Sequence, residues 1–222
     1  MKRYLPFILV AIVAIAAIAG GVMLLRAKRA AVLTTPLAKL GPASAAETVH
    51  ALGPDKAPVV LEEFGDFQCP PCGKLSEPLN DLERKFHGRL RIIYRNFPLM
   101  MHANARAAAA TAEAAGLQGR FWEMHDLLYR EQNVWSKVKD PRPLFRSYAA
   151  LLKLDLGRFS RDVDSEEVRS RITRDEERGK AAGVSVTPSI FINNKRVSGP
   201  GLSPDGLREE IEKALNSQTP SS

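Results

Sequence analysis

Residues 58–75 read PVVLEEFGDFQCPPCGKL and contain both cysteines of the 222-residue chain, Cys69 and Cys72. The apolar run before the cysteines predicts a buried central strand. After them, leucines recur at helical spacing from Leu75 onward, which predicts a helix with one apolar face. The only two cysteines therefore lie where a strand passes into a helix.

The segments that follow predict an alternation of strands and helices. Residues 89–99 (RLRIIYRNFPL) predict a second strand, which completes a βαβ unit with parallel strands. Residues 102–182 are helical in pattern, with NARAAAATAEAA as the strongest helix former. Next, SIFI and KRVSG flank Asn193-Asn194 and predict a hairpin, and residues 203–216 predict a last helix. This order predicts an α/β thioredoxin-like fold (βαβ plus ββα) with an inserted helical block at about 102–182.

The N-terminus has the pattern of a membrane anchor. Residues 5–25 are 21 positions without a charge, enough for a transmembrane helix of about 30 Å. We therefore expect an anchor or uncleaved signal over 1–30; the alternative is a cleaved signal peptide, whose apolar region is usually about 7–15 residues long. Residues 31–56 are rich in Ala, Pro, Gly and Thr and predict a linker, 57–216 the folded domain, and 217–222 a flexible tail.

The basic charge is concentrated in the N-terminal segment. The formal net charge is +7, and residues 1–29 account for +5 of it, since they hold five basic residues and no acid. The remaining residues carry only +2. A basic groove is not indicated, and we expect no nucleic-acid partner.

The position of the cysteines predicts redox chemistry. The first turn of a helix has unpaired N–H groups and a partial positive charge, which favour a thiolate over a thiol. Cys69, at the exposed N-terminus of the helix, is the candidate nucleophile. Cys72, one turn further in, is the candidate resolving cysteine, which can close a disulfide with Cys69. Pro70 and Pro71 stiffen the loop and remove two N–H donors.

Other interpretations of the pair are weaker. A structural disulfide in so short a loop would add little stability. A zinc site usually needs four ligands, but the chain has no second cysteine pair and its histidines lack ligand spacing, so we expect no metal and no cofactor. Soft thiolates suit Cu(I), so a copper-carrying module stays open as an alternative.

Glu63 is a candidate acid–base residue, six positions before Cys69 on the first strand. Burial would raise its pKa and let it take the proton of Cys72 during exchange. Side chains alternate along a strand, so Glu62 and Glu63 cannot share a face. We favour Glu63 over Glu62 as the acid that points at the inner cysteine; the alternative is that both are ordinary strand residues, one of which faces solvent.

The stretch GVSVTPSIFI contains a second candidate element. Pro188 starts a strand after a loop, where cis X-Pro bonds are most often kept. A cis bond there would turn the backbone N–H and carbonyl of Thr187 outward, toward an extended substrate peptide. The alternative is a trans proline that merely begins the strand.

Three stretches resemble the DsbA-like thioredoxin family of bacterial thiol–disulfide oxidoreductases: LGPDKAPVVLEEFGDFQCPPC, YRNFPLMMHANARAAAATAEAAGLQGRFWEMHDLLY and GVSVTPSIFINNKRVSG. The resemblance implies a thioredoxin fold with a helical insertion and an extracytoplasmic location. It also implies Cys69 as nucleophile, Cys72 as resolving cysteine, Glu63 as buried acid, and Thr187 with cis-Pro188 beside them. The best-known oxidases of this family carry His in the dipeptide and many relatives carry an aromatic residue, so Pro-Pro leaves the redox potential open.

We therefore expect an enzyme of the bacterial cell envelope that forms or exchanges disulfides in exported proteins with cysteines. Its domain would face the periplasm, anchored in the inner membrane through residues 5–25, or be secreted after cleavage. A quinone-linked membrane protein (DsbB- or VKOR-like) is the expected redox partner. The alternatives are a thiol reductase or isomerase of the same fold, or a non-catalytic module that binds clients or carries Cu(I).

Overall fold

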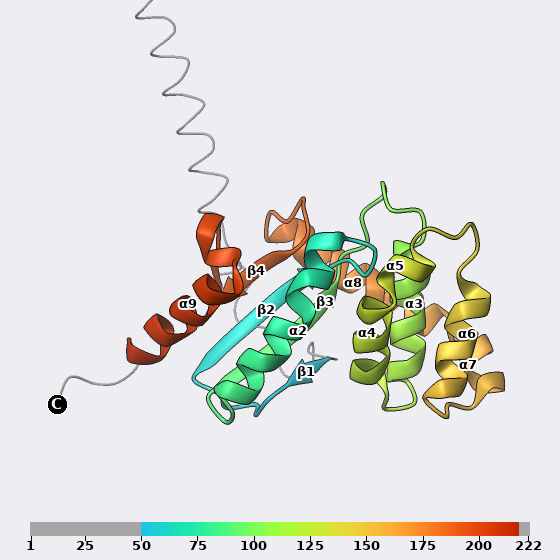
Figure 1. The fold of residues 1–222 in the computed structure, drawn as a ribbon, viewed down its shortest axis with the longest axis horizontal. Coiled ribbons are helices and arrows are strands. Elements are labelled where there is room, and N and C mark those ends of the chain that lie inside the picture. Colours follow the sequence, from blue (N-terminus) through green and yellow to red (C-terminus); the bar gives the residue numbers. More distant parts are fainter. Residues whose placement is uncertain (1–49, 218–222) are drawn as a thin grey trace, which may run out of the picture.

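The computed structural model describes residues 50–217 (Figure 1). The strands and helices, in chain order, are β1 (Ala51–Leu52), β2 (Val59–Gly65), α2 (Pro70–Lys85), β3 (Leu90–Asn96), α3 (Ala105–Gly116), α4 (Phe121–Arg130), α5 (Gln132–Trp135), α6 (Arg142–Leu151), α7 (Leu156–Asp162), α8 (Glu166–Ala181), β4 (Ser189–Ile192), β5 (Lys195–Arg196), the 3₁₀ turn η3 (Gly199–Leu202) and α9 (Pro204–Asn216). The predicted transmembrane helix lies outside the described residues. Among residues 50–217, no helix has both the length and the apolar character needed to span a bilayer.

A five-stranded sheet forms the centre, in the order β1-β3-β2-β4-β5. Strands β2 and β3 are parallel, and the other neighbours are antiparallel. Strands β2 and β3 with α2 form the predicted βαβ unit, and β4, β5 and α9 form the ββα unit. The predicted thioredoxin-like α/β fold with a helical insertion is confirmed.

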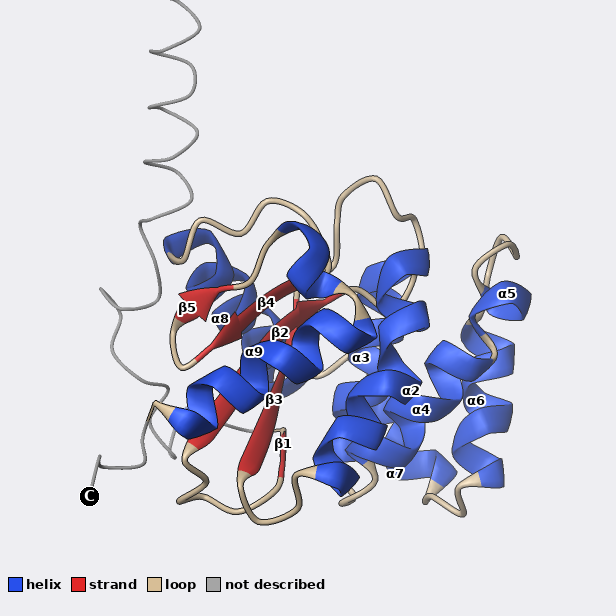
Figure 2. Ribbon diagram, turned by 60° about the vertical axis from the view of Figure 1, so that its left-hand side comes forward, coloured by secondary structure: helices blue, strands red, loops and turns tan. Residues whose placement is uncertain are grey.

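Helices cover both faces of the sheet (Figure 2). Helices α2 and α9 pack on one face over an apolar cluster that includes Leu61, Leu79 and Ile211. On the other face α8 passes so close to the strands that a Cβ on Gly179 would lie 3.0 Å from the ring of Phe64. Neither face of β2 is therefore open to solvent.

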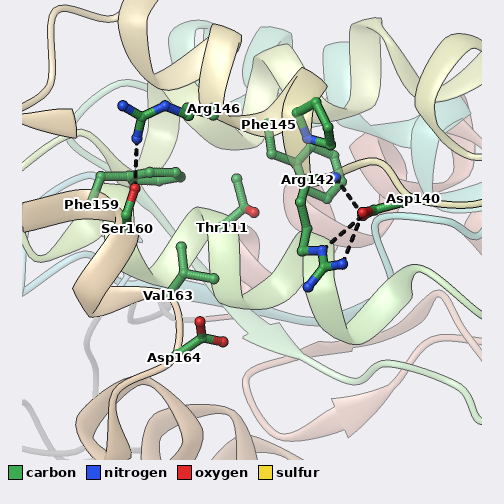
Figure 3. A pocket seen from close by; sticks show the side chains of 10 residues that line it. Thr111, Asp140, Arg142, Phe145, Arg146, Phe159, Ser160, Val163 and Asp164 are labelled. Carbon is green, nitrogen blue, oxygen red and sulfur yellow. Dashed lines mark hydrogen bonds and ion pairs between the residues drawn. The ribbon is translucent and has the colours of Figure 1, made fainter. Parts of the chain in front are cut away.

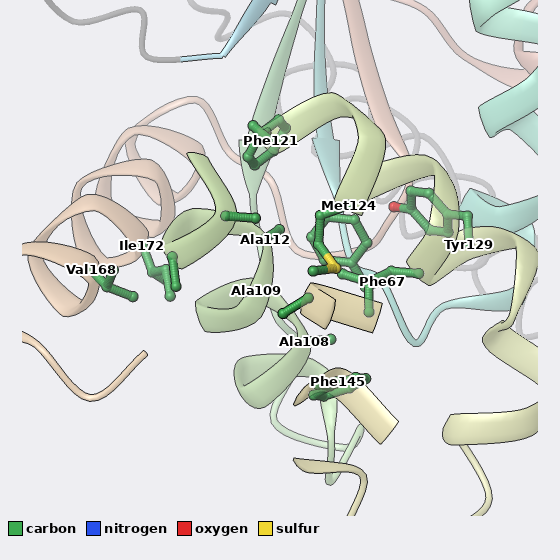
Figure 4. Close-up of a cluster of buried hydrophobic side chains, with 14 of the residues drawn as sticks. Phe67, Ala108, Ala109, Ala112, Phe121, Met124, Tyr129, Phe145, Val168 and Ile172 are labelled. Atoms are coloured by element: carbon green, nitrogen blue, oxygen red, sulfur yellow. The ribbon is translucent and has the colours of Figure 1, made fainter. Parts of the chain in front are cut away.

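The insertion is a bundle of helices α3 to α8 built around the alanine-rich α3. Small side chains let the neighbouring helices approach α3 closely, and the cluster is completed by larger side chains (Figure 4). Those labelled in the figure are Phe67, Ala108, Ala109, Ala112, Phe121, Met124, Tyr129, Phe145, Val168 and Ile172. Cys69 and Cys72 belong to the same cluster, so they lie where the insertion meets the sheet domain.

Several element ends follow from local features of the sequence. The hydroxyl of Ser165 caps α8 by accepting the N–H of Val168, and that of Ser203 caps α9. Asn193 and Asn194 both have positive φ, as the hairpin turn requires.

The linker prediction for residues 31–56 is wrong at its C-terminal end. Ala51 and Leu52 form β1, which pairs with β3, and His50 stacks on the ring of Phe121 at 3.4 Å between centroids. His50 Nε2 also lies 2.9 Å from the carboxylate of Glu113. A two-residue edge strand is too short to show an apolar period, so only its tertiary contacts reveal it.

Candidate active site

Cys69 occupies the N-cap of α2, as the strand-to-helix pattern predicts. Its N–H donates to the carbonyl of Asp66 (3.0 Å), and its carbonyl accepts the first helical bond from Gly73 (3.2 Å). The positive end of the helix therefore lies at its sulfur. Cys69 is only 4 % exposed, whereas an exposed position was expected, because the insertion packs over it.

The two sulfurs differ strongly in acidity. Both cysteines are free thiols, and Cys72 is fully buried. A hydrogen bond from the Cys72 thiol, which outweighs the effect of burial, lowers the pKa of Cys69 to about 6. Burial raises the pKa of Cys72, and the hydrogen bond to Cys69 raises it further. The pair thus places its negative charge on Cys69 and keeps the proton on Cys72.

The bond between Thr187 and Pro188 is cis and lies beside Cys69. Cys69 Sγ is 3.3 Å from the carbonyl oxygen of Thr187. Thr187 and Pro188 are half-buried, and the side chain of Val186 just before them is exposed. This loop and the cysteine loop, about 118 positions apart in the chain, form one surface around the Cys69 sulfur.

Glu63 lies on the face of β2 against which α2, with its two cysteines, packs. It is 3 % exposed, and burial, with a smaller effect from the Cys69 charge, raises its pKa to about 8. Its charge in turn raises the pKa of Cys72. Glu63 is thus a buried acid that interacts electrostatically with both cysteines.

Glu62 does not face solvent either, so the alternative in which one of the two glutamates is exposed does not hold. It is 4 % exposed on the opposite face and accepts hydrogen bonds from Arg95 Nε (2.9 Å) and Arg178 Nε (2.7 Å). Arg95 also donates to Asp175 (3.0 Å). The sequence correctly predicted that the two side chains project to opposite faces of β2. It did not reveal that α8 covers the face of Glu62, because that depends on tertiary packing.

Comparison with known proteins agrees with this geometry. A family model described as thioredoxin matches residues 45–213. The chain belongs to the thioredoxin family. BdbD from Bacillus subtilis, in its oxidised form, is 26 % identical, with a TM-score of 0.69 over 79 % of this chain and 97 % of that one. The alpha-DsbA1 of Wolbachia pipientis shares the fold, with 20 % identity and a TM-score of 0.63 over 76 % of this chain and 94 % of that one. The resemblance to DsbA-like proteins is thereby confirmed.

One curated relative of this chain is a much longer protein. The Na(+)/H(+) antiporter NhaA 1 of Salinispora arenicola is 40 % identical over 152 residues. That match covers 68 % of this chain but only 22 % of the antiporter. The chain thus spans about a fifth of the length of this relative.

Sequence reasoning missed the residues that hold the cysteine loop of this thioredoxin domain. Asp66, 1 % exposed, accepts the N–H of Gln68 (2.7 Å) and that of Leu99 (2.9 Å), and its Oδ2 lies 2.7 Å from His102 Nδ1. A carboxylate between Phe64 and Phe67 is the one local signal that could have identified it.

Gln132, in α5, holds the same loop from the insertion. Its Nε2 donates to the carbonyls of Phe67 (2.7 Å) and Cys69 (3.0 Å). Gln68 Nε2 donates back to the carbonyl of Ser136 (3.0 Å). These partners are more than 60 positions apart, so no local pattern in the sequence could reveal them.

A hollow in the insertion lies away from the cysteines (Figure 3). It has a volume of about 360 Å³ and is lined by residues of α3, α6, α7 and the adjoining turns, with Phe145 and Phe159 in its wall. Arg142 is paired with Asp140 there, and Arg146 donates to the hydroxyl of Ser160. Within residues 50–217, no group of three or more His, Cys, Asp or Glu side chains could hold a metal ion.

Proposed function

We propose that this chain is an extracytoplasmic thiol–disulfide oxidoreductase that forms or exchanges disulfides in exported proteins through Cys69 and Cys72. One observation carries the proposal: the acidic sulfur of Cys69 at the start of α2, with the protonated thiol of Cys72 beneath it. Such a pair suits exchange, because the more acidic thiol is the better leaving group.

Oxidation of a client follows from this arrangement in two steps. A client thiolate attacks Cys69 Sγ of the Cys69–Cys72 disulfide; the S–S bond breaks, and its electron pair stays on Cys72 Sγ, which takes a proton from Glu63. A second client thiolate then attacks the client sulfur of the mixed disulfide, and Cys69 leaves as a thiolate. The client loses two electrons and the cysteine pair gains them.

Clients would bind at the surface around Cys69. The carbonyl of Thr187 is next to the sulfur, and an extended peptide could pair with the backbone there. The side chains of Met100, Met101 and Val186 are strongly exposed, and Leu99, just before the methionines, is bonded to Asp66 of the cysteine loop. Adaptable apolar side chains of this kind suit varied, unfolded clients.

The location and the redox partner are part of the proposal. Residues 5–25 would anchor the domain in the inner membrane, facing the periplasm. The reduced pair needs an oxidant for each cycle, and a quinone-linked membrane protein would remove the two electrons. The transport activity named for the antiporter relatives belongs to those longer chains and is not proposed here.

The deciding experiment measures disulfide formation in a reduced client, with the full chain and its Cys69→Ala variant. We expect the wild type to form client disulfides and the variant to lose this activity. Equal activity of the two would reject the proposal and favour a client-binding module. A reduction potential of about −120 mV for the Cys69–Cys72 pair would mark an oxidant, and one of about −270 mV would mark a reductant.

A further inference from the structure

Glu63 holds its proton where it has almost no contact with solvent. It is 3 % exposed, and the proposed chemistry requires it to give up and regain a proton in every cycle. Burial raises its pKa to about 8, so near neutral pH it must release a proton before it can accept that of Cys72. A path from Glu63 to water is therefore needed.

Tyr94 is the neighbour of Glu63 on the adjoining strand β3. The two residues are partners in the register of β2 and β3, so their side chains project from the same face of the sheet. The Tyr94 ring extends over Gly65, two positions along that face: a Cβ at Gly65 would lie 2.6 Å from Cε2 and 2.8 Å from the hydroxyl oxygen of Tyr94. The absence of a side chain at Gly65 thus leaves the space that the hydroxyl occupies.

Tyr129 continues from Tyr94 toward the surface. The two hydroxyl oxygens are 2.9 Å apart, and either can be the donor. Tyr129 lies on α4 and also lines a polar hollow of about 300 Å³ between α2 and α4. The other residues that line this hollow are Gly73, Ser76, Glu77, Asn80, Asp126 and Arg130.

The electrostatic surroundings keep both tyrosines protonated. Burial raises their pKa values well above 10, with further effects from the charges of Glu63 and Cys72. Asp66 also acts on Tyr94. His125 packs against both rings at 4.9 Å between centroids; burial lowers its pKa, and its Nδ1 lies 2.9 Å from Asp126 Oδ1. A neutral hydroxyl can accept one proton while it gives up its own, so no tyrosinate needs to form.

We propose that the hydroxyls of Tyr94 and Tyr129 relay protons between Glu63 and water in the hollow between α2 and α4. Glu63 gives its proton to Tyr94, Tyr94 passes its own to Tyr129, and Tyr129 releases one to water. One proton leaves the carboxyl group and one reaches solvent. Rotation of the two hydroxyl groups then restores their original hydrogen bond. The inference rests on the proposed function, because it serves the Cys72 proton.

The test is a rapid-mixing measurement with reduced full-length protein and oxidised glutathione. Cys69 first forms a mixed disulfide with glutathione, and Cys72 then releases a second glutathione, whose rate of release is measured from pH 6 to pH 9. We expect Tyr129→Phe, and independently Tyr94→Phe, to slow this second release at least threefold at pH 6.5 and little at pH 9, where Glu63 is already ionised. Imidazole should restore part of the lost rate.

The control is Tyr148→Phe, which removes a hydroxyl from α6, where the ring packs against Phe145, and should leave the rate unchanged. Wild-type rates in both relay variants at pH 6.5, or an equal slowing at every pH, would overturn the relay. Failure of the wild type to release the second glutathione would instead overturn the proposed function, so the two failures are distinguishable.

Discussion

Glu62 and Glu63 are adjacent on β2, both are at least nine-tenths buried, and they project to opposite faces of the sheet. Glu62 is held by the guanidinium groups of Arg95 and Arg178. Glu63 has no ion pair within residues 50–217, and it faces the cysteines instead. Two neighbouring carboxyl groups of similar burial therefore have different surroundings, and the two substitutions below are each other's control.

Glu62→Gln should destabilise the protein. The substitution removes the carboxylate that Arg178 pairs with and one of the two that Arg95 pairs with, and breaking a buried pair costs about 3 kcal/mol or more. Urea unfolding at pH 7 measures the loss. A change below about 1 kcal/mol would show that Asp175 alone compensates Arg95.

Glu63→Gln should instead stabilise the reduced protein. The carboxyl pKa is raised from 4.5 to about 8, so the unfolded chain loses this proton above about pH 4.5 while the folded chain keeps it. The stability of the wild type therefore falls as pH rises from about 4.5 to 8. The gain from the variant should grow over that window, with an upper limit of roughly 5 kcal/mol at about 1.4 kcal/mol per pKa unit.

Unfolding of the reduced protein at pH 5 and pH 8 measures this gain. Asp175, whose pKa is raised to about 6 by burial, titrates in wild type and variant alike, so the difference isolates Glu63. A gain that does not change with pH would contradict a buried protonated carboxyl.

The alkylation of Cys69 should show a midpoint near pH 6. The pKa of its thiol is lowered from 9.0 to about 6, so the stabilisation of the reduced form is complete above about pH 9 and is lost as pH falls through 6. The rate of reaction with iodoacetamide measures the midpoint. Cys72→Ala should move it upward, because the Cys72 thiol supplies the main hydrogen bond; a midpoint near 9 in the wild type would refute the assignment.

Gln132→Ala should loosen the cysteine loop. The carbonyl of Phe67 loses the donor that Gln132 supplies, and the carbonyl of Cys69 keeps only the N–H of Gly73, at a cost of about 1–3 kcal/mol. Thermal unfolding measures the stability, and the alkylation midpoint reports the position of Cys69. Gln118→Ala is a suitable control, since its side chain bonds the exposed backbone of Asp155. Equal effects of the two substitutions would argue against a specific role for Gln132.

Replacing Met100 and Met101 by serine should weaken client binding without altering the thiols. These side chains are the two most exposed large apolar groups among residues 50–217. We expect a rise of at least threefold in KM for an unfolded protein client and no change with glutathione. Leu151→Ser, at an exposed apolar position on α6, should have no effect. Equal KM values would place the client surface elsewhere.

The sequence by itself determined the order of strands and helices, the helix caps and the position of the cysteine pair. These features depend on residues within a few positions of one another: Ser203 before its helix, Asn193-Asn194 in a hairpin turn, Cys69 between a strand and a helix. Steric limits and hydrogen bonds act over that same short range, so the local pattern is sufficient.

Only the tertiary structure decided the burial of Glu62 and Cys69, the pairing of β1, and the contacts of Gln132 and Tyr129. Each of these depends on an element that the chain reaches tens of positions later or earlier, such as α8 over the second face of β2. Burial and nearby charges also set the pKa values of the groups at the site. Both depend on all the atoms that surround a group, including those from distant parts of the chain. The redox pair could thus be located from the sequence, whereas its proton chemistry required the packed structure.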